Sequence, residues 1–379
     1  MKEKRNRSCV VLLCLCLAFP IGAVADDVDR ESFSNIFVFG DSLSDTGNAA
    51  TAADAGPFLE EFADGNFRPD LLRFLTDPND RVALCFPDIV RQDNMIVEVN
   101  PDFPCDDLFF MNSRVSNGPV AVEVLAKRLG FGALQPSLYF WEPLGLPLLG
   151  LPRPFVGTNY AVAGATAQGS SLADLNSQVL GFLLDHGLFS APQDALYVVI
   201  IGGNDIIAAV DAPEGIRPLI ITNAVNAIAS NIDALIEAGA RRFLVANSLN
   251  IGSVPAAGMD ADLATSLAKE FNQRLAERLD QVRVQRQQLV DLEIKEFNLF
   301  RFFEVVRRLG RLLGVFVNID EACFESGAYR DFGRPAEFHP DCGPSKFDRF
   351  VFFDDLHPTG LVHRIVGKAL SVAARRLAN

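Results

Sequence analysis

A serine stands shortly after a short apolar run near the start of the chain. The run covers residues 35–39, and Gly40, Asp41 and Ser42 follow it, ahead of the mostly polar residues 44–48. A serine on such a turn exposes its hydroxyl, and nearby backbone N–H groups can face a negative charge that develops in a reaction. Serine and aspartate are also routine helix caps, so this block alone leaves a nucleophile and a cap as alternatives.

A carboxylate and an imidazole lie close together near the other end of the chain. Asp354 and His357 are three residues apart, after an apolar run and just before an expected helix. A carboxylate at that spacing can orient one imidazole nitrogen, and the other nitrogen can then remove the proton of Ser42. A metal pair is the alternative, but no third or fourth ligand is evident. No aspartate stands three residues before any of the other histidines, which are His186, His339 and His363.

Two further blocks offer hydrogen-bond donors. Gly164 lies among small residues that permit close approach of the backbone, so its N–H can point into a site. Asn204 follows an apolar run and two glycines, and its side-chain amide is a suitable donor to an oxyanion. We expect Asp205 to cap the helix that follows. The alternatives are tight packing of the turn at Gly164 and a turn role for Asn204.

Taken together and in this order, the four blocks resemble the GDSL-type lipases and esterases, also called SGNH hydrolases. Residues 39–48 look most like the bacterial lecithinase–haemolysin and plant secreted branches. The resemblance implies a carboxylic ester hydrolase that needs no metal or organic cofactor. It implies Ser42 as nucleophile, His357 as base and Asp354 as the acid that orients His357. It also implies an oxyanion hole formed by Gly164, Asn204 and the backbone N–H of Ser42.

The expected substrate is a small-molecule or lipid ester, with an acyl or lipid ester as the first expectation. Residues 138–155 hold Tyr139, Phe140, Trp141 and several leucines among four prolines, which excludes a regular helix. This stretch suits a core-covering loop, the wall of an apolar pocket or a lid. An acetyl-carbohydrate esterase, a metal-dependent hydrolase, and a secreted binding or membrane-active protein on the same scaffold are the alternatives.

Regular elements must position these blocks, and the hydrophobic pattern predicts them. Apolar runs predict strands over 35–39, 195–201, 242–246, 289–297 and 350–353. Helical spacing predicts helices over 120–129, 221–239, 263–279, 299–313 and 359–377. Such alternation implies a three-layer α/β/α sandwich with a central, mostly parallel sheet, and the resemblance implies the flavodoxin-like form of it. Three of the blocks directly follow an expected strand, where open α/β sheets place their sites.

The chain start predicts export. A basic segment, an apolar run over 10–19 and the small residues Ala23 and Ala25 are typical of a signal peptide over residues 1–25. The remaining residues, 26–379, are expected to form a single hydrolase domain with a long, loop-rich insertion around 50–155. The protein is therefore expected to be extracellular or periplasmic, with transient contact with a lipid surface possible for a lipid ester substrate.

Charge and cysteine usage narrow the class further. The formal net charge is −14, which argues against nucleic acid as a partner because such binding needs a basic surface. Four of the seven cysteines lie beyond the signal peptide, and an even number in an exported chain predicts disulfides. We favour Cys85–Cys105 and Cys323–Cys342, which close short loops. A zinc site is the competitor, and His339 with Cys342 is the one nearby pair.

Overall fold

A parallel sheet of four strands forms the centre of the computed structural model, which describes residues 33–49, 114–137, 139, 157–325, 337–342 and 346–377. The strand order is β1 (Ile36–Gly40), β2 (Leu196–Ile200), β3 (Arg242–Ala246) and β4 (Glu293–Phe297). β1 and β2 are buried along their whole length, as expected of parallel strands with helices on both faces. On the open side of β1, the backbone at Asn159 pairs with Val38.

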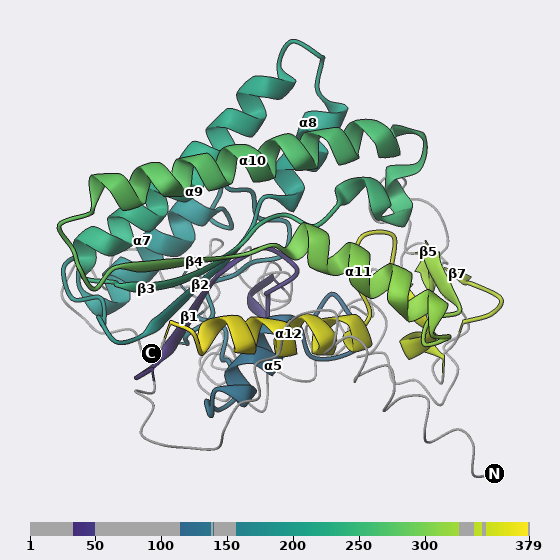
Figure 1. The fold of residues 1–379 in the computed structure, drawn as a ribbon, viewed down its shortest axis with the longest axis horizontal. Coiled ribbons are helices and arrows are strands. Elements are labelled where there is room, and N and C mark those ends of the chain that lie inside the picture. Colours follow the sequence, from purple (N-terminus) through teal and green to yellow (C-terminus); the bar gives the residue numbers. More distant parts are fainter. Residues whose placement is uncertain are drawn as a thin grey trace, which may run out of the picture.

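Helices cover both faces of this sheet (Figure 1). α7 (Leu175–His186), α9 (Arg217–Ala238) and α10 (Ala261–Gln285) lie on one face, whereas α5 (Ala121–Arg128) and α12 (Gly360–Ala374) lie on the other. Among the described residues, α9 is the helix long and apolar enough to cross a membrane, but half of that apolar stretch is buried, as in a core helix. The predicted three-layer α/β/α sandwich with a parallel central sheet is confirmed.

A second, smaller group of strands lies beside the main sheet. β8 (Phe350–Phe352) pairs in parallel with β5 (Asn318–Ala322), and β6 (Phe324–Glu325) pairs with β7 (Glu337–Phe338). The apolar run 350–353 therefore forms a strand outside the central sheet. Cys323 and Cys342 form the expected disulfide, and Cys323 packs with Phe347, Phe350 and Phe353.

Several elements differ from the sequence-based expectations. The hydrophobic pattern did not predict α7, and α8 (Gly203–Asp211) was expected only as the helix that Asp205 would cap. Gln178 and Gly181 stand on the buried face of α7 and Leu180 is exposed, which conceals its apolar period. The expected strand over 289–297 begins only at Glu293. Short 3-10 segments η2 (Ile251–Ser253), η3 (Pro255–Asp260) and η4 (Phe347–Arg349) and the helix α11 (Leu299–Leu312) complete the described elements.

Some expectations fall outside the described residues. These are the signal peptide over 1–25, the Cys85–Cys105 disulfide, and most of the 50–155 insertion with its apolar stretch. Of that stretch, Tyr139 is described, and its buried ring lies 5.9 Å from the ring of Tyr160 while its hydroxyl donates to the Leu172 carbonyl at 2.5 Å. The single-domain organisation stays a prediction.

Candidate active site

The turn after β1 presents Ser42 at the edge of the sheet. β1 and β2 approach closely at its start, because a Cβ on Gly40 would lie 2.3 Å from the Ile200 carbonyl oxygen. The backbone N–H of Ser44 and of Asp45 each donate to the Asp41 carbonyl at 3.0 Å, which closes the turn around Ser42. The Ser42 hydroxyl caps no described helix, so the structure does not support the cap alternative.

Ser42, His357 and Asp354 form one chain of polar contacts. His357 Nε2 lies 2.8 Å from Ser42 Oγ, although the two residues are 315 positions apart. His357 Nδ1 lies 2.9 and 2.8 Å from the two carboxylate oxygens of Asp354. A carboxylate only accepts, so Nδ1 carries the hydrogen and Nε2 is left to accept the serine proton. This arrangement can move a proton off the hydroxyl.

The loop between β8 and α12 fixes both partners of Ser42. Asp354 Oδ1 also accepts the backbone N–H groups of Leu356 at 2.8 Å and His357 at 2.7 Å. The Phe353 N–H donates to the His357 carbonyl at 2.8 Å, so the loop is closed on itself. The His357 side chain is 14% exposed and that of Asp354 is 11% exposed. The imidazole is therefore held in place yet still reachable from outside.

Charge around His357 favours its protonated form. Burial alone would lower the pKa of His357, but the charge of Asp354 and its hydrogen bond raise it, and the charges of Asp41 and Asp355 add to this. The net result is a pKa above the ordinary value of 6.5. An imidazole that accepts a serine proton becomes an imidazolium, so this field stabilises the product of that proton transfer.

Two buried carboxyl groups lie behind the serine turn. Burial raises the pKa of Asp41 to about 7, against the hydrogen bond from the Leu43 N–H and the charge of His357. Burial likewise raises the pKa of Asp205 to about 6, against hydrogen bonds from Ala167 and Gln168. The negative charge of Asp205 also raises the pKa of Asp41. Burial thus favours the neutral form of Asp41.

Asn204 faces the same hollow as Ser42 and His357. It stands in the first turn of α8, and its side-chain nitrogen donates to the Ala165 carbonyl at 2.8 Å. This bond ties Asn204 to the turn that holds Gly164, whose φ is +82° and whose α-carbon faces open space. Gly164 is exposed and is not one of the described residues that line the hollow. Gly164 is thus connected to the hollow through its neighbour Ala165, whose carbonyl accepts from Asn204.

Asp205 differs from its predicted role. It stands in the first turn of α8, but its carboxylate accepts the backbone N–H of Ala167 at 2.8 Å and of Gln168 at 3.3 Å. It therefore anchors the segment after Gly164 and does not cap α8. Asp174 extends this anchor, because it accepts the N–H groups of Thr166 and Ser171.

Buried polar residues that the sequence did not single out hold the Gly164 backbone against the serine turn. Asp45 accepts four backbone N–H groups, including that of Ala163 at 2.8 Å. Asn48 donates to the carbonyls of Asn159 and Ala161, and Asn159 donates back to the Ser44 carbonyl at 2.7 Å. The clue in the sequence is the density of Asp and Asn directly after Ser42, since such side chains satisfy loop backbone.

Gln178 holds the end of β1 from the side of α7. Its side chain is fully buried, accepts from the Gly40 N–H at 2.8 Å and donates to the Gly40 carbonyl at 2.7 Å. Both backbone groups of Gly40 are thereby paired two residues before Ser42. No pattern in the sequence marks this glutamine, because α7 itself was not predicted.

A hollow opens beside Ser42 along the edge where the four strands end. Its apolar lining comes from Leu43, Ile200, Ile201, Ile207, Leu249, Ile251, Val254, Leu299 and Leu356. These residues stand at or after the ends of β1 to β4 and after β8, so the hollow borders the carboxyl ends of the four central strands. Two of its polar residues are internally bonded: Asn247 Oδ1 accepts from the Phe300 N–H and Ser248 Oγ donates to the Leu249 carbonyl.

The other histidines take structural positions. His186 stacks on Phe182, and His339 lies 3.3 Å from Glu321. His363 is buried and accepts the Ala121 N–H at 3.2 Å, and burial lowers its pKa to about 3. No cluster of three or more potential metal ligands occurs in the part of the chain that the structure describes. Cys342 is in the disulfide, so the zinc alternative with His339 is wrong.

Comparison with known proteins identifies similar sequences. The model of the family described as GDSL-like Lipase/Acylhydrolase matches residues 36–370. Lipase 1 of Photorhabdus luminescens is 38% identical over 135 residues, 33% of this chain and 20% of that protein, so the chain spans about a fifth of that relative. Acetylajmalan esterase 2 of Rauvolfia serpentina is 26% identical over 373 residues, 88% of each chain. A GDSL esterase/lipase of Arabidopsis thaliana is 23% identical and covers 92% of this chain and 85% of its own.

The effect of the Asp354 charge on the pKa of His357 can be measured directly. In Asp354→Asn we expect the pKa of His357 to fall, because the negative charge that stabilises the imidazolium is lost while the burial remains. NMR titration of the imidazole resonances in both proteins measures the change. Asp348→Asn removes an exposed carboxylate paired with Arg364 and is the control, with no effect expected. An unchanged pKa in Asp354→Asn contradicts the assignment.

Proposed function

The chain belongs to the GDSL-like lipase/acylhydrolase family of carboxylic ester hydrolases, and we propose that Ser42 is the nucleophile that forms its acyl-enzyme. The single observation that carries this proposal is the contact chain from Ser42 through His357 to Asp354. Nucleophile, base and orienting acid need that order of contacts, and the distances of 2.8 Å at both steps are within hydrogen-bond range.

The reaction follows from these contacts. His357 Nε2 takes the proton of Ser42 as Oγ bonds to the ester carbonyl carbon, and the carbonyl oxygen becomes an oxyanion. When the carbon–oxygen bond to the alcohol breaks, the imidazolium returns that proton to the leaving alkoxide. Water then attacks the acyl-enzyme with His357 again as base, which releases the carboxylic acid and restores Ser42. Asp354 keeps Nδ1 protonated through both halves.

The proposed oxyanion hole consists of Asn204, Gly164 and the backbone N–H of Ser42. The amide nitrogen of Asn204 carries two hydrogens, and its bond to the Ala165 carbonyl orients the second toward the hollow. The positive φ of Gly164 and the anchoring of the residues on both sides of it support a preorganised donor there. Preorganised donors lower the barrier most, because they need no rearrangement as the charge develops.

The proposed substrate class is an acyl or lipid ester. The hollow beside Ser42 is lined largely by aliphatic side chains, which suits a hydrocarbon chain. A short acyl group on a carbohydrate is the second candidate, and the name of one relative, Acetylajmalan esterase 2, refers to an acetylated substrate. The two candidates differ in how the rate depends on acyl length.

We also propose that the protein is exported, to the extracellular space or the periplasm, with transient contact with a lipid surface as a lipid ester would require. The signal-like residues 1–25 and the Cys323–Cys342 disulfide support export, because disulfides persist in oxidising compartments.

Ser42→Ala tests the nucleophile. We expect ester turnover to fall to background, because no other group takes the place of Oγ, while the thermal unfolding midpoint stays unchanged. A fluorophosphonate probe should label Ser42 of the wild type and nothing in the variant. Labelling at another residue, or wild-type activity of the variant on p-nitrophenyl esters, contradicts both the assignment of Ser42 as nucleophile and the mechanism derived from it. A binding protein on this scaffold predicts no labelling at all.

Asn204→Ala tests the oxyanion hole. We expect kcat to fall by about 10²–10³-fold, equal to about 2.7–4 kcal/mol of transition-state stabilisation, with little change in KM. Steady-state kinetics on one chromogenic ester measures it. Asn226→Ala, on the outer face of α9 away from the hollow, is the control. A kcat equal to that of the wild type assigns Asn204 to structure alone.

Acyl length tests the substrate class. Across p-nitrophenyl esters from acetate to decanoate, we expect kcat/KM to rise with chain length until the chain fills the hollow, since each buried CH₂ contributes about 0.8 kcal/mol. Leu249→Phe, which narrows the hollow, should shift the preferred length downward. A preference for acetate that Leu249→Phe leaves unaltered favours the acetyl-ester candidate.

A further inference from the structure

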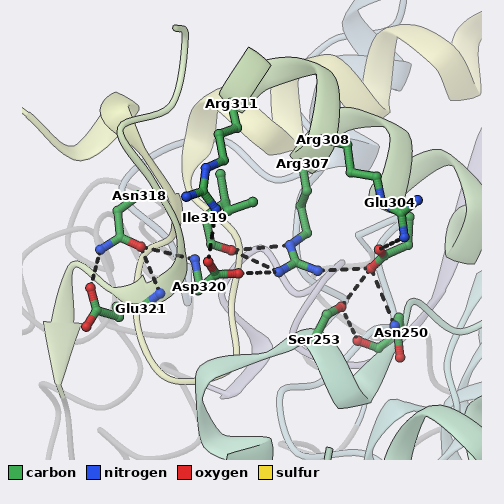
Figure 2. Close-up of polar contacts among 10 residues, drawn as sticks. All are labelled: Asn250, Ser253, Glu304, Arg307, Arg308, Arg311, Asn318, Ile319, Asp320 and Glu321. Atoms are coloured by element: carbon green, nitrogen blue, oxygen red, sulfur yellow. Dashed lines mark hydrogen bonds and ion pairs between the residues drawn. The ribbon is translucent and has the colours of Figure 1, made fainter. Parts of the chain in front are cut away.

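A single carboxylate on α11 gathers donors from the wall of the hollow. Glu304 Oε1 accepts from Ser253 Oγ at 3.0 Å, from Asn250 Nδ2 at 3.4 Å and from Arg307 at 3.0 Å (Figure 2). Its side chain is 18% exposed and that of Arg307 is 11% exposed. Charge-assisted hydrogen bonds of this kind are stronger than those between neutral groups, and partial burial reduces their screening.

The segment bound by Glu304 forms part of the hollow. Ile251 and Val254 line it, and Asn250 and Ser253 alternate with them along η2. Asn250 also receives a hydrogen bond from Thr265 of α10 at 2.9 Å, and a Cβ on Gly252 would lie 2.1 Å from the Ala261 carbonyl. The segment thus lies between α10 and α11 and is held by polar contacts on both sides.

Through Arg307, Glu304 is also linked to β8, the strand that precedes the loop with Asp354 and His357. We call this loop the acid–base loop. Arg307 donates to the Ile319 carbonyl and to Asp320 of β5, and its guanidinium lies 5.8 Å from the ring centre of Phe352 in β8. Figure 2 shows the polar contacts as a continuous row from Asn250 through Glu304 and Arg307 to Asp320. The residues after η2 also contact the acid–base loop directly, because the Ala256 N–H donates to the Asp355 carbonyl at 2.9 Å.

We propose that Glu304 is a positioning residue that fixes the wall of the acyl hollow, by holding η2 so that Ile251 and Val254 face the bound acyl chain. This inference rests on the acyl-ester function proposed above. Ile251 and Val254 contribute the contact, and Glu304 touches no reacting atom. The Thr265 bond and the close packing of Gly252 hold η2 on the α10 side, and the bonds to Glu304 hold it on the α11 side.

The proposal predicts a loss of substrate affinity that increases with the length of the acyl chain. Without the carboxylate, the Asn250 amide loses this acceptor and Ser253 Oγ keeps only the Asn250 carbonyl, 2.7 Å away, so η2 loses its polar contacts with Glu304 and gains freedom at the wall. A long acyl chain uses this wall and a short one does not. In Glu304→Ala we therefore expect KM for p-nitrophenyl octanoate to rise by about tenfold and KM for the acetate to change less than twofold. Glu304→Gln keeps one acceptor oxygen and should restore part of the octanoate affinity.

A matched set of variants isolates this effect. Asp233→Ala removes another partly buried carboxylate, which pairs with Arg286 at the far end of α10, and should leave both KM values unchanged. Ser253→Ala keeps the Glu304 charge and removes one bond to η2. Combined with Glu304→Ala it should raise the octanoate KM by less than the product of the two single effects, because both act through the same contact. Ser253→Ala alone keeps the test valid if Glu304→Ala does not fold.

The outcomes separate the inference from the function on which it rests. Fluorophosphonate labelling of Ser42 and the wild-type ratio of octanoate to acetate kcat/KM test the proposed function. If the wild type labels and prefers octanoate, an unchanged ratio in Glu304→Ala overturns the positioning role alone. A loss of equal size on both esters also overturns it, since the effect then acts through Asp355 and the acid–base loop. Purely additive effects of Glu304→Ala and Ser253→Ala overturn it as well.

Discussion

Buried carboxylates that accept backbone N–H groups hold the loops of this protein in place. Loops lack the ladder partners that satisfy helices and strands, and an unpaired buried N–H is costly. Asp45 accepts four such groups beside the serine turn, Asp205 accepts two after Gly164, and Asp354 accepts two in the loop that carries His357. The loops that carry Ser42, Gly164 and His357 are therefore held by carboxylate acceptors, in addition to the strands and helices at their ends.

These carboxylate anchors explain why the site combines polar loops with an apolar hollow. A carboxylate takes several donors at once, so it can shape an irregular loop within a few residues. The cost is desolvation, which raises the pKa of Asp41 and Asp205 to about 7 and about 6. Beside these anchors the strand ends present aliphatic side chains. The result is a polar edge at Ser42 that opens onto a largely apolar hollow, an arrangement that suits the proposed acyl ester substrate.

The sequence predicts much of the frame and the residues of the proposed site, because both leave periodic or ordered marks. The strands over 35–39 and 242–246 are apolar runs, and Ser42 with His357 stand after such runs. The long-range contacts that support the site leave no periodic or ordered pattern in the sequence. Gln178 pairs with Gly40 across 138 residues, and the pairing of β8 with β5 depends on packing at a distance. Long-range polar contacts cannot be found from local pattern, since any Asn, Gln or Asp has the same chemistry wherever it lies.

The contact between Ser42 and His357 has a consequence for the order in which the protein matures. It joins the turn after the first described strand to the loop before the last helix, across 315 residues. α5 and α12, which cover the same face of the sheet, likewise meet from distant parts of the chain. Contacts of such sequence separation form late, after the intervening elements are in place. An incomplete chain emerging from the ribosome therefore holds Ser42 without its contact to His357, and the proposed catalytic pair is assembled only late in folding.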